Sequence, residues 1–173
     1  GEPIVQNTIY PRFWSLDDQL EQLLKLEPEA HRIWLALNAM MSSPNRVDDN
    51  AVSRAHDRLI ARLQGAGVEL IAMDHAFPQW MTLTRCRDPK AHGCIPRRDM
   101  RAGSTYRRFL DNYEATWRTL ARRFAKIRRW EPGNETNHDP FLKPAFGRFS
   151  FVDKAAITTD LMYRAHRGIH AAN

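Results

Sequence analysis

The sequence has few cysteines, few lysines and no long apolar run, and the first and the last of these shortages each exclude a class of protein. Two cysteines in 173 residues are too few for a disulfide-rich secreted scaffold. No apolar stretch approaches the 18 residues of a membrane-spanning helix, and the first residues lack the charged and apolar regions of a signal peptide. We therefore expect a soluble chain without a membrane partner. Removal of a signal peptide before Gly1 stays open, as does the choice between a cytoplasmic and a secreted location.

Lysine supplies only five of the 26 basic residues, and arginine supplies the rest of a charge of +6. A basic protein binds nucleic acid when its charges gather on one face. Arg54, Arg58 and Arg62 form a helical ridge, but the other arginines are dispersed, and no zinc-finger, helix-turn-helix or RNA-recognition pattern accompanies them. We interpret the arginines as solvent-exposed helix faces, which leaves nucleic acid as the weaker alternative partner.

The cysteines, Cys86 and Cys94, lie in one polar stretch with His92 between them. Three ligands at this spacing match no standard zinc pattern. We interpret the cysteines as free thiols, with a loop-closing disulfide and a metal clip as the alternatives. The sequence gives no reason to expect a metal or another cofactor.

Helical and strand patterns alternate along the chain, which indicates an α/β fold. Leucine periodicity, polar caps and glycine stops predict helices over 16–26, 48–64, 104–124 and 152–169, and apolar runs predict buried strands over 31–37, 68–73 and 127–132. Residues 38–45 and 76–103 are expected to be loops. Such alternation is typical of a parallel sheet with right-handed crossovers.

Two architectures fit this alternation: an open sheet and part of a closed barrel. Three open strands would leave two bare edges, and a doubly wound nucleotide-binding sheet would need a glycine-rich turn after a strand, whereas Gly65-Ala66-Gly67 precedes one. We therefore predict an incomplete (β/α)8 TIM barrel. Because the chain is shorter than the roughly 250 residues of a complete barrel, residues 1–173 are expected to form a partial catalytic domain of about the first to fourth βα units.

Polar and aromatic side chains follow each predicted strand. Asn38 follows the first, Asp74-His75 with Trp80 follow the second, and Asn134-Glu135 follow the third. Side chains at the C-terminal ends of parallel strands meet at one edge of the sheet. Amides, carboxylates and imidazoles bind sugar hydroxyls, and indoles stack on the apolar faces of sugar rings. The pattern therefore indicates a carbohydrate site.

The stretches Asp74–Trp80 and Trp130–Glu135, with Tyr106–Tyr113 between them, resemble the β-glucosidase family of clan A glycoside hydrolases. The similarity spans roughly residues 30 to 170. The matching family signatures are His-Trp-Asp-x-Pro after the third barrel strand and Asn-Glu-Pro after the fourth. The resemblance implies an enzyme, a retaining glycoside hydrolase that cleaves a β-linked glycoside.

The resemblance also assigns roles to individual residues. Glu135 is then the general acid/base, Asn134 binds the sugar 2-hydroxyl, His75 binds a neighbouring hydroxyl, and Trp80 is a stacking platform. Arg32 resembles the arginine that this clan places near its nucleophile. The clan's nucleophile comes from the seventh strand, so the resemblance implies that the remaining barrel segment, or another chain that completes the fold, supplies it.

Each of these residues also has a structural interpretation, which the sequence leaves open. Glu135 can be a loop carboxylate without chemistry, His75 a hydrogen-bonded core residue, Trp80 a packing residue and Arg32 the structural partner of a carboxylate. Two other functions also remain open: a catalytically silent carbohydrate-binding relative and a basic nucleic-acid-binding domain. The sugar, the linkage and the choice between exo and endo cleavage are not determined.

Overall fold

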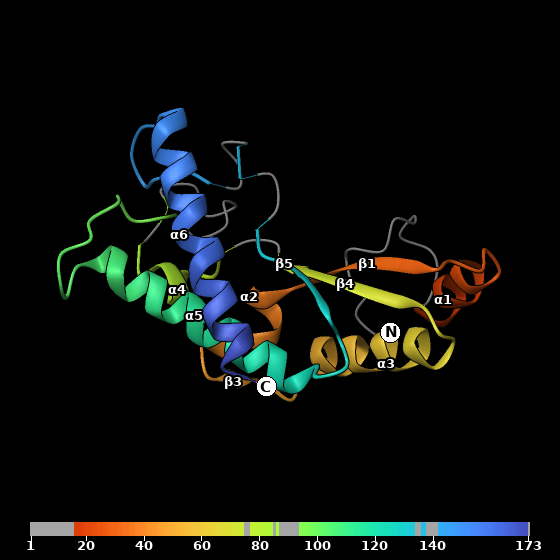
Figure 1. Cartoon of the computed structure of the whole chain (residues 1–173). Helices are drawn as coiled ribbons and strands as arrows, with labels where there is room; N and C mark the ends of the chain where they lie inside the picture. The colour runs from red at the N-terminus through yellow and green to blue at the C-terminus, as the bar shows by residue number, and fades with distance from the viewer. Residues whose placement is uncertain are drawn as a thin grey trace.

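The computed structural model describes residues 16–74, 77–84, 86, 94–133, 136–137 and 142–172, and every structural statement below concerns these residues. The four predicted helices and three predicted strands are present in the predicted order, with two further short helices and two further short strands among them (Figure 1). In chain order they are α1 (Leu16–Leu24), β1 (Ala30–Leu35), α2 (Leu37–Met40), β2 (Met41–Ser43), β3 (Arg46–Val47), α3 (Ala51–Gly65), β4 (Glu69–Asp74), α4 (Gln79–Thr82), α5 (Thr105–Arg123), β5 (Arg129–Glu131) and α6 (Phe151–His170).

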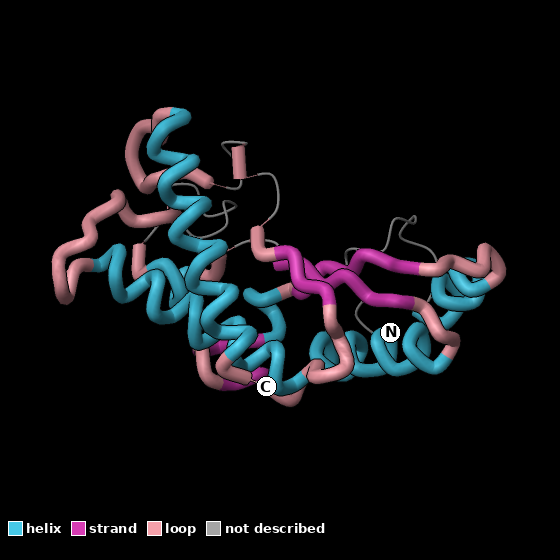
Figure 2. The backbone as a smooth tube through the Cα atoms, viewed as in Figure 1, coloured by secondary structure: helices cyan, strands magenta, loops and turns pink. Residues whose placement is uncertain are grey.

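The main sheet has three parallel strands in the order β1-β4-β5. Leu35 of β1 pairs with Asp74 of β4, and Met73 of β4 pairs with Glu131 of β5. The strands therefore run side by side and end at the same edge of the sheet, as the tube in Figure 2 shows. The prediction of neighbouring parallel strands separated by helices is confirmed.

The prediction of an incomplete (β/α)8 TIM barrel is wrong, because the described residues form a small α/β domain with an open three-stranded sheet and six helices. Neighbouring strands rotate by roughly 20–25°, so three strands turn too little for the last to pair with the first, as closure requires. The prediction assumed that open edges are avoided. Here the edges are tolerable because β5 has only three residues and both edge strands carry charged side chains, such as Arg32 and Arg129.

The sheet has one apolar face and one mixed face, set by the alternation of side chains along each strand. Ile33 and Ala72 are buried side by side on the first face, in register with Trp130. The ring of Trp130 meets Trp117 of α5 edge to face, with centroids 5.6 Å apart. Helix α5 therefore packs against this face of the sheet.

Helix α5 forms because a helical stripe of large aromatic side chains follows a good cap. The side chain of Ser104 accepts a hydrogen bond from the backbone N–H of Arg107, which satisfies one of the free donors of the first turn. Four aromatic residues on the stripe are fully or almost fully buried: Tyr106, Phe109, Tyr113 and Trp117. This helix contributes the largest side chains of the core.

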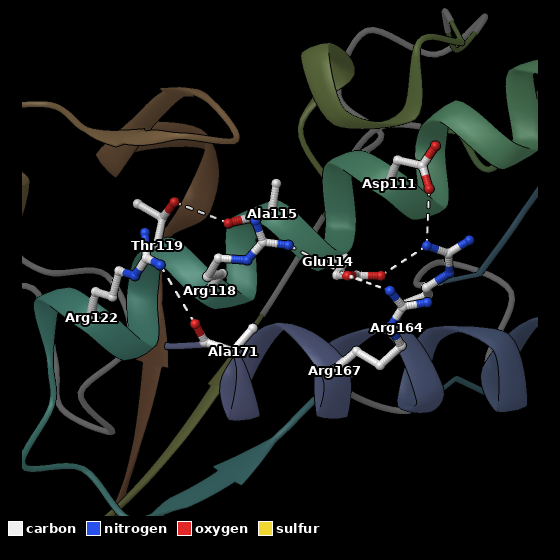
Figure 3. Close-up of polar contacts among 9 residues, drawn as sticks. All are labelled: Asp111, Glu114, Ala115, Arg118, Thr119, Arg122, Arg164, Arg167 and Ala171. Carbon is white, nitrogen blue, oxygen red and sulfur yellow. Dashed lines mark hydrogen bonds and ion pairs between the residues drawn. The ribbon is translucent and has the colours of Figure 1, made fainter. Parts of the chain in front are cut away.

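Helices α5 and α6 are joined by a buried ionic network, shown in Figure 3. Nη1 of Arg164 on α6 lies 2.8 Å from Glu114 and 2.9 Å from Asp111, both on α5. Arg118 and Arg167 also approach Glu114, each at 3.4 Å. Glu114 and Arg164 are almost fully buried, so the network fixes how the two helices cross.

The structure corrects the loop predictions, because the short helix α4 lies within the predicted loop 76–103 and α2 overlaps the predicted loop 38–45. The predicted loop 38–45 contains most of a small antiparallel hairpin, β2 with β3, closed around Pro44 and Asn45. Cys86 and Cys94 form a disulfide with a Cα–Cα distance of 5.3 Å. The interpretation as free thiols is therefore wrong and the alternative of a loop-closing disulfide is confirmed, because the chain brings the two Cα atoms within the range that a disulfide spans.

Candidate functional site

The candidate site lies where β4 and β5 end, and its centre is the carboxylate of Asp74. Asp74 is the last residue of β4 and is 2% exposed. Its Oδ2 accepts a hydrogen bond from the hydroxyl of Tyr113 at 3.1 Å, and its Oδ1 accepts one from the backbone N–H of Gly133. A strand end, a core helix and the turn after β5 therefore meet at one carboxylate.

Burial gives Asp74 an unusual ionisation. Desolvation raises the pKa of its carboxyl from 3.8 to about 6, although the hydrogen bonds from Gly133 and Tyr113 favour the charged form, and the nearby charge of Glu131 adds a small increase. The same burial raises the pKa of Tyr113 well above its usual value. Asp74 therefore titrates close to neutral pH, where small changes in its contacts alter its charge.

Gly133 makes the turn after β5 that reaches Asp74. Its φ of +84° lies in the left-handed region, and a Cβ there would come within 3.0 Å of Thr136 Cγ2. Glycine is the residue that adopts this conformation without strain. The sequence Glu131-Pro132-Gly133 carried a signal for a turn, but no pattern in the sequence pointed to Asp74 as its anchor.

The face of the sheet opposite to Asp74 carries an ion pair between Arg32 and Glu131. Nε and Nη2 of Arg32 on β1 donate to the two carboxylate oxygens of Glu131 on β5, at 2.7 and 2.5 Å. The two side chains span the central strand β4, since β1 and β5 are not neighbours. Arg32 thus has the carboxylate partner that its structural interpretation required, and this partner is on the strand that leads into Asn134-Glu135.

Trp80, predicted as a stacking platform, is half buried on α4 and packs against the hydrophobic core. Its indole N–H donates to the backbone oxygen of Met41 at 2.9 Å, which joins α4 to β2. The side chain of Asn112 on α5 donates to the Trp80 carbonyl at 3.3 Å. These contacts agree with the packing interpretation, and they leave the partly exposed ring as the surface available for stacking.

Glu135, Asn134 and His75 lie outside the described residues, so their predicted roles stay predictions. The structure does describe their sequence neighbours: Asp74 precedes His75 and Gly133 precedes Asn134. Asp74 and Gly133 are hydrogen-bonded to each other. The described residues that precede the two predicted sugar-binding segments are therefore in direct contact.

The described residues contain no group of His, Cys, Asp and Glu side chains arranged to hold a metal ion. Within the same part of the chain, none of the helices is long and apolar enough to cross a membrane. The arginines of the ridge on α3, Arg54, Arg58 and Arg62, are exposed. Several other arginines pair with carboxylates, as Arg123 does with Asp57.

Neither a known protein-family model nor a curated protein sequence matches this chain.

Proposed function

We propose that the chain is part of a retaining glycoside hydrolase that cleaves a β-linked glycoside. Glu135 is the general acid/base of this proposal, and Asn134 and His75 bind sugar hydroxyls. One observation carries it: a hydrogen bond joins Gly133, which precedes Asn134 and Glu135 in the sequence, to Asp74, which precedes His75.

The described carboxylates fit supporting roles better than the role of nucleophile. Glu131 is held at both oxygens by Arg32, and Asp74 is buried against α5 and the turn at Gly133. A retaining enzyme needs an ionised carboxylate about 5 Å from the acid/base and open to the anomeric carbon. In this proposal the nucleophile therefore comes from outside the described residues, from another segment or another chain.

Asp74 is a positioning residue in this proposal. Its buried carboxylate holds the backbone N–H of Gly133, two residues before Glu135. An acid/base works only when its carboxyl is within reach of the glycosidic oxygen, and a fixed turn before it limits where the carboxyl can go. Arg32 acts in a similar way, because it fixes Glu131 at the end of β5.

The test is the kinetics of Glu135→Gln in the complete catalytic unit, with aryl β-glycosides of good and poor leaving groups. Loss of the general acid is expected to lower turnover roughly 100- to 10,000-fold for poor leaving groups and much less for good ones. Glu69→Gln is the matched control, because Glu69 is a carboxylate at the other end of β4. Equal effects on both leaving-group classes would contradict the proposal.

A separate measurement distinguishes an enzyme from a catalytically silent sugar-binding relative. Sugar binding is measured on the present chain by calorimetry with methyl β-glycosides. Binding together with turnover in the complete unit supports the hydrolase, whereas binding without turnover indicates the silent relative. Salt-dependent binding of an oligonucleotide without sugar binding would indicate instead a nucleic-acid-binding domain.

A further inference from the structure

A groove of about 920 Å³ lies between the connections that follow β4 and β5. Leu83, Thr84 and residues 95–99 come from the first connection, 144–146 come from the second, and the first turn of α5 closes one side. Tyr106 of α5 lines the groove, and Tyr113, seven residues later on the same helix, binds Asp74. Seven residues of helix span roughly 10 Å, so the groove lies within reach of an extended ligand held at the candidate site.

The walls of the groove are fixed before any ligand binds. The backbone N–H of Ile95 donates to the carbonyl of Lys143 at 2.9 Å, which joins the two connections. The disulfide at Cys94 immediately precedes Ile95, and the hydroxyl of Ser104 holds the carbonyl of Asp99 at 2.5 Å. A site that is already ordered loses less entropy on binding, so the groove is suited to a small molecule.

Two large apolar side chains line the groove while exposed to solvent. Phe146 is 62% exposed and Leu83 is 44% exposed, and between them the lining includes the buried Ile95 and the prolines Pro96 and Pro144. Exposed apolar side chains beside a concave surface are typical of binding sites. A flat apolar group, such as an aromatic ring, fits this lining.

Among the described residues, the charges of the lining leave one guanidinium, that of Arg97, without an ion pair, although the charge of Asp153 acts on it from a longer distance. Arg98 pairs with Asp160 at 2.8 Å, and Asp99 pairs with Arg101 at 2.7 Å. Arg97 has its described hydrogen bond to a neutral group, the carbonyl of Phe146, at 3.3 Å. Arg97 and Phe146 both line the groove, and one bond to a carbonyl leaves other N–H donors of the guanidinium available. The groove therefore favours an anionic group next to an apolar one.

We propose that the groove binds the leaving group of the glycoside, an aromatic carboxylate whose ring packs on Phe146 and Leu83 and whose carboxylate pairs with Arg97. This inference rests on the proposed hydrolase only for the origin of the ligand. The chemistry of the groove selects the ligand class: an apolar surface lies beside a guanidinium whose described hydrogen bond goes to a neutral carbonyl. A guanidinium binds a carboxylate through paired N–H donors, which gives both orientation and charge complementarity.

The test is binding of 4-hydroxycinnamate and its methyl ester to the full chain, followed by calorimetry and by NMR shifts. The acid is expected to bind at least about fivefold more tightly than the ester, as one charge-assisted hydrogen bond provides. Arg97→Gln is expected to abolish this preference, Arg97→Lys to keep part of it, and Phe146→Ala to weaken both ligands. Arg62→Gln is the matched control, because Arg62 is an exposed arginine on α3.

Equal binding of acid and ester, an unchanged preference in Arg97→Gln, or no binding at millimolar concentration would each overturn the inference. Concentration-dependent self-association that Phe146→Ala removes would also overturn it, because a second copy of the chain would then occupy the groove. Binding does not depend on turnover. Failure of the Glu135→Gln kinetics with intact binding of the acid would therefore refute the hydrolase alone, and the reverse result would refute the groove alone.

Discussion

The backbone N–H of Gly133 donates to the carboxylate of Asp74, although 59 residues separate them in the sequence. The bond joins the end of β4 to the turn after β5, and the hydroxyl of Tyr113 completes the arrangement from α5. Because the carboxylate is buried, each of its two contacts affects both its charge and the stability of the strand ends.

The variant Asp74→Asn is expected to change how stability depends on pH. The folded pKa of about 6 is higher than the unfolded value of 3.8, so the native state binds the proton more tightly. Proton binding to Asp74 therefore stabilises the folded state by at most about 3 kcal/mol. This stabilisation is complete below about pH 4 and is lost as the pH rises through 6. Urea unfolding of both proteins at pH 4, 5, 6 and 7 measures it. Parallel pH curves for the two proteins would show that Asp74 does not titrate in this window.

The variant Tyr113→Phe removes one hydrogen bond to the Asp74 carboxylate. That bond favours the charged form, so its loss is expected to raise the pKa of Asp74 above 6 and to cost about 1–2 kcal/mol of stability at pH 7. An NMR titration of the Asp74 carboxyl carbon measures the pKa. Tyr163→Phe, at an exposed position on α6, is the control and is expected to leave both quantities unchanged.

Gly168→Ala tests the close crossing of α5 and α6. A Cβ at Gly168 would lie 2.3 Å from the backbone oxygen of Glu114, so the helices must separate, at a cost of about 3 kcal/mol or more. Gly65→Ala is the matched control, because a Cβ at this helical glycine meets nothing within 4 Å. The control is expected to gain up to about 1 kcal/mol. Similar unfolding midpoints for the two variants would contradict the described crossing.

Glu114→Gln tests the buried ionic network of Figure 3. The change leaves the guanidinium of Arg164 buried without its closest carboxylate, which is expected to cost about 3–5 kcal/mol. Asp111→Asn removes the other carboxylate contact of Arg164, but Asp111 is largely exposed, so less than about 1 kcal/mol is expected. Chemical denaturation of both variants gives the comparison. A loss in Asp111→Asn as large as in Glu114→Gln would contradict this ranking.

Reduction of the disulfide between Cys86 and Cys94 is expected to lower stability by about 2–3 kcal/mol. The intact bond closes a short loop and so restricts the unfolded chain, and reduction removes this restriction. The double variant Cys86→Ser/Cys94→Ser is expected to show the same loss without reductant and no further loss with it. Thiol titration of the unreduced protein in denaturant is the direct check. Two reactive thiols in that titration would rule out the disulfide.

Periodic apolar side chains made much of the secondary structure predictable. The aromatic stripe of α5 and its cap at Ser104 are local features, and so are the apolar runs of β1 and β4. The hairpin of β2 and β3 escaped prediction because its strands, of three and two residues, are too short to show alternation. The disulfide escaped because spacing alone does not show whether two cysteines approach each other.

The candidate site was predictable only in part. The convergence of strand ends followed from the alternation of strands and helices, since parallel strands end at one edge. The pairing of Arg32 with Glu131 did not, because these residues are 99 positions apart and meet across a central strand. The same holds for the groove near Arg97, whose two walls come from separate connections.

By itself the sequence determined which segments become helices and strands and that the strands lie parallel, because these properties depend on side-chain period and on local caps. Only the tertiary structure decided that the sheet stays open, that Asp74 is buried with a raised pKa, and that Arg97 lines a groove and donates there to a backbone carbonyl. The physical reason is that strand closure, desolvation and charge pairing depend on distances between segments far apart in the chain. Local pattern does not contain those distances.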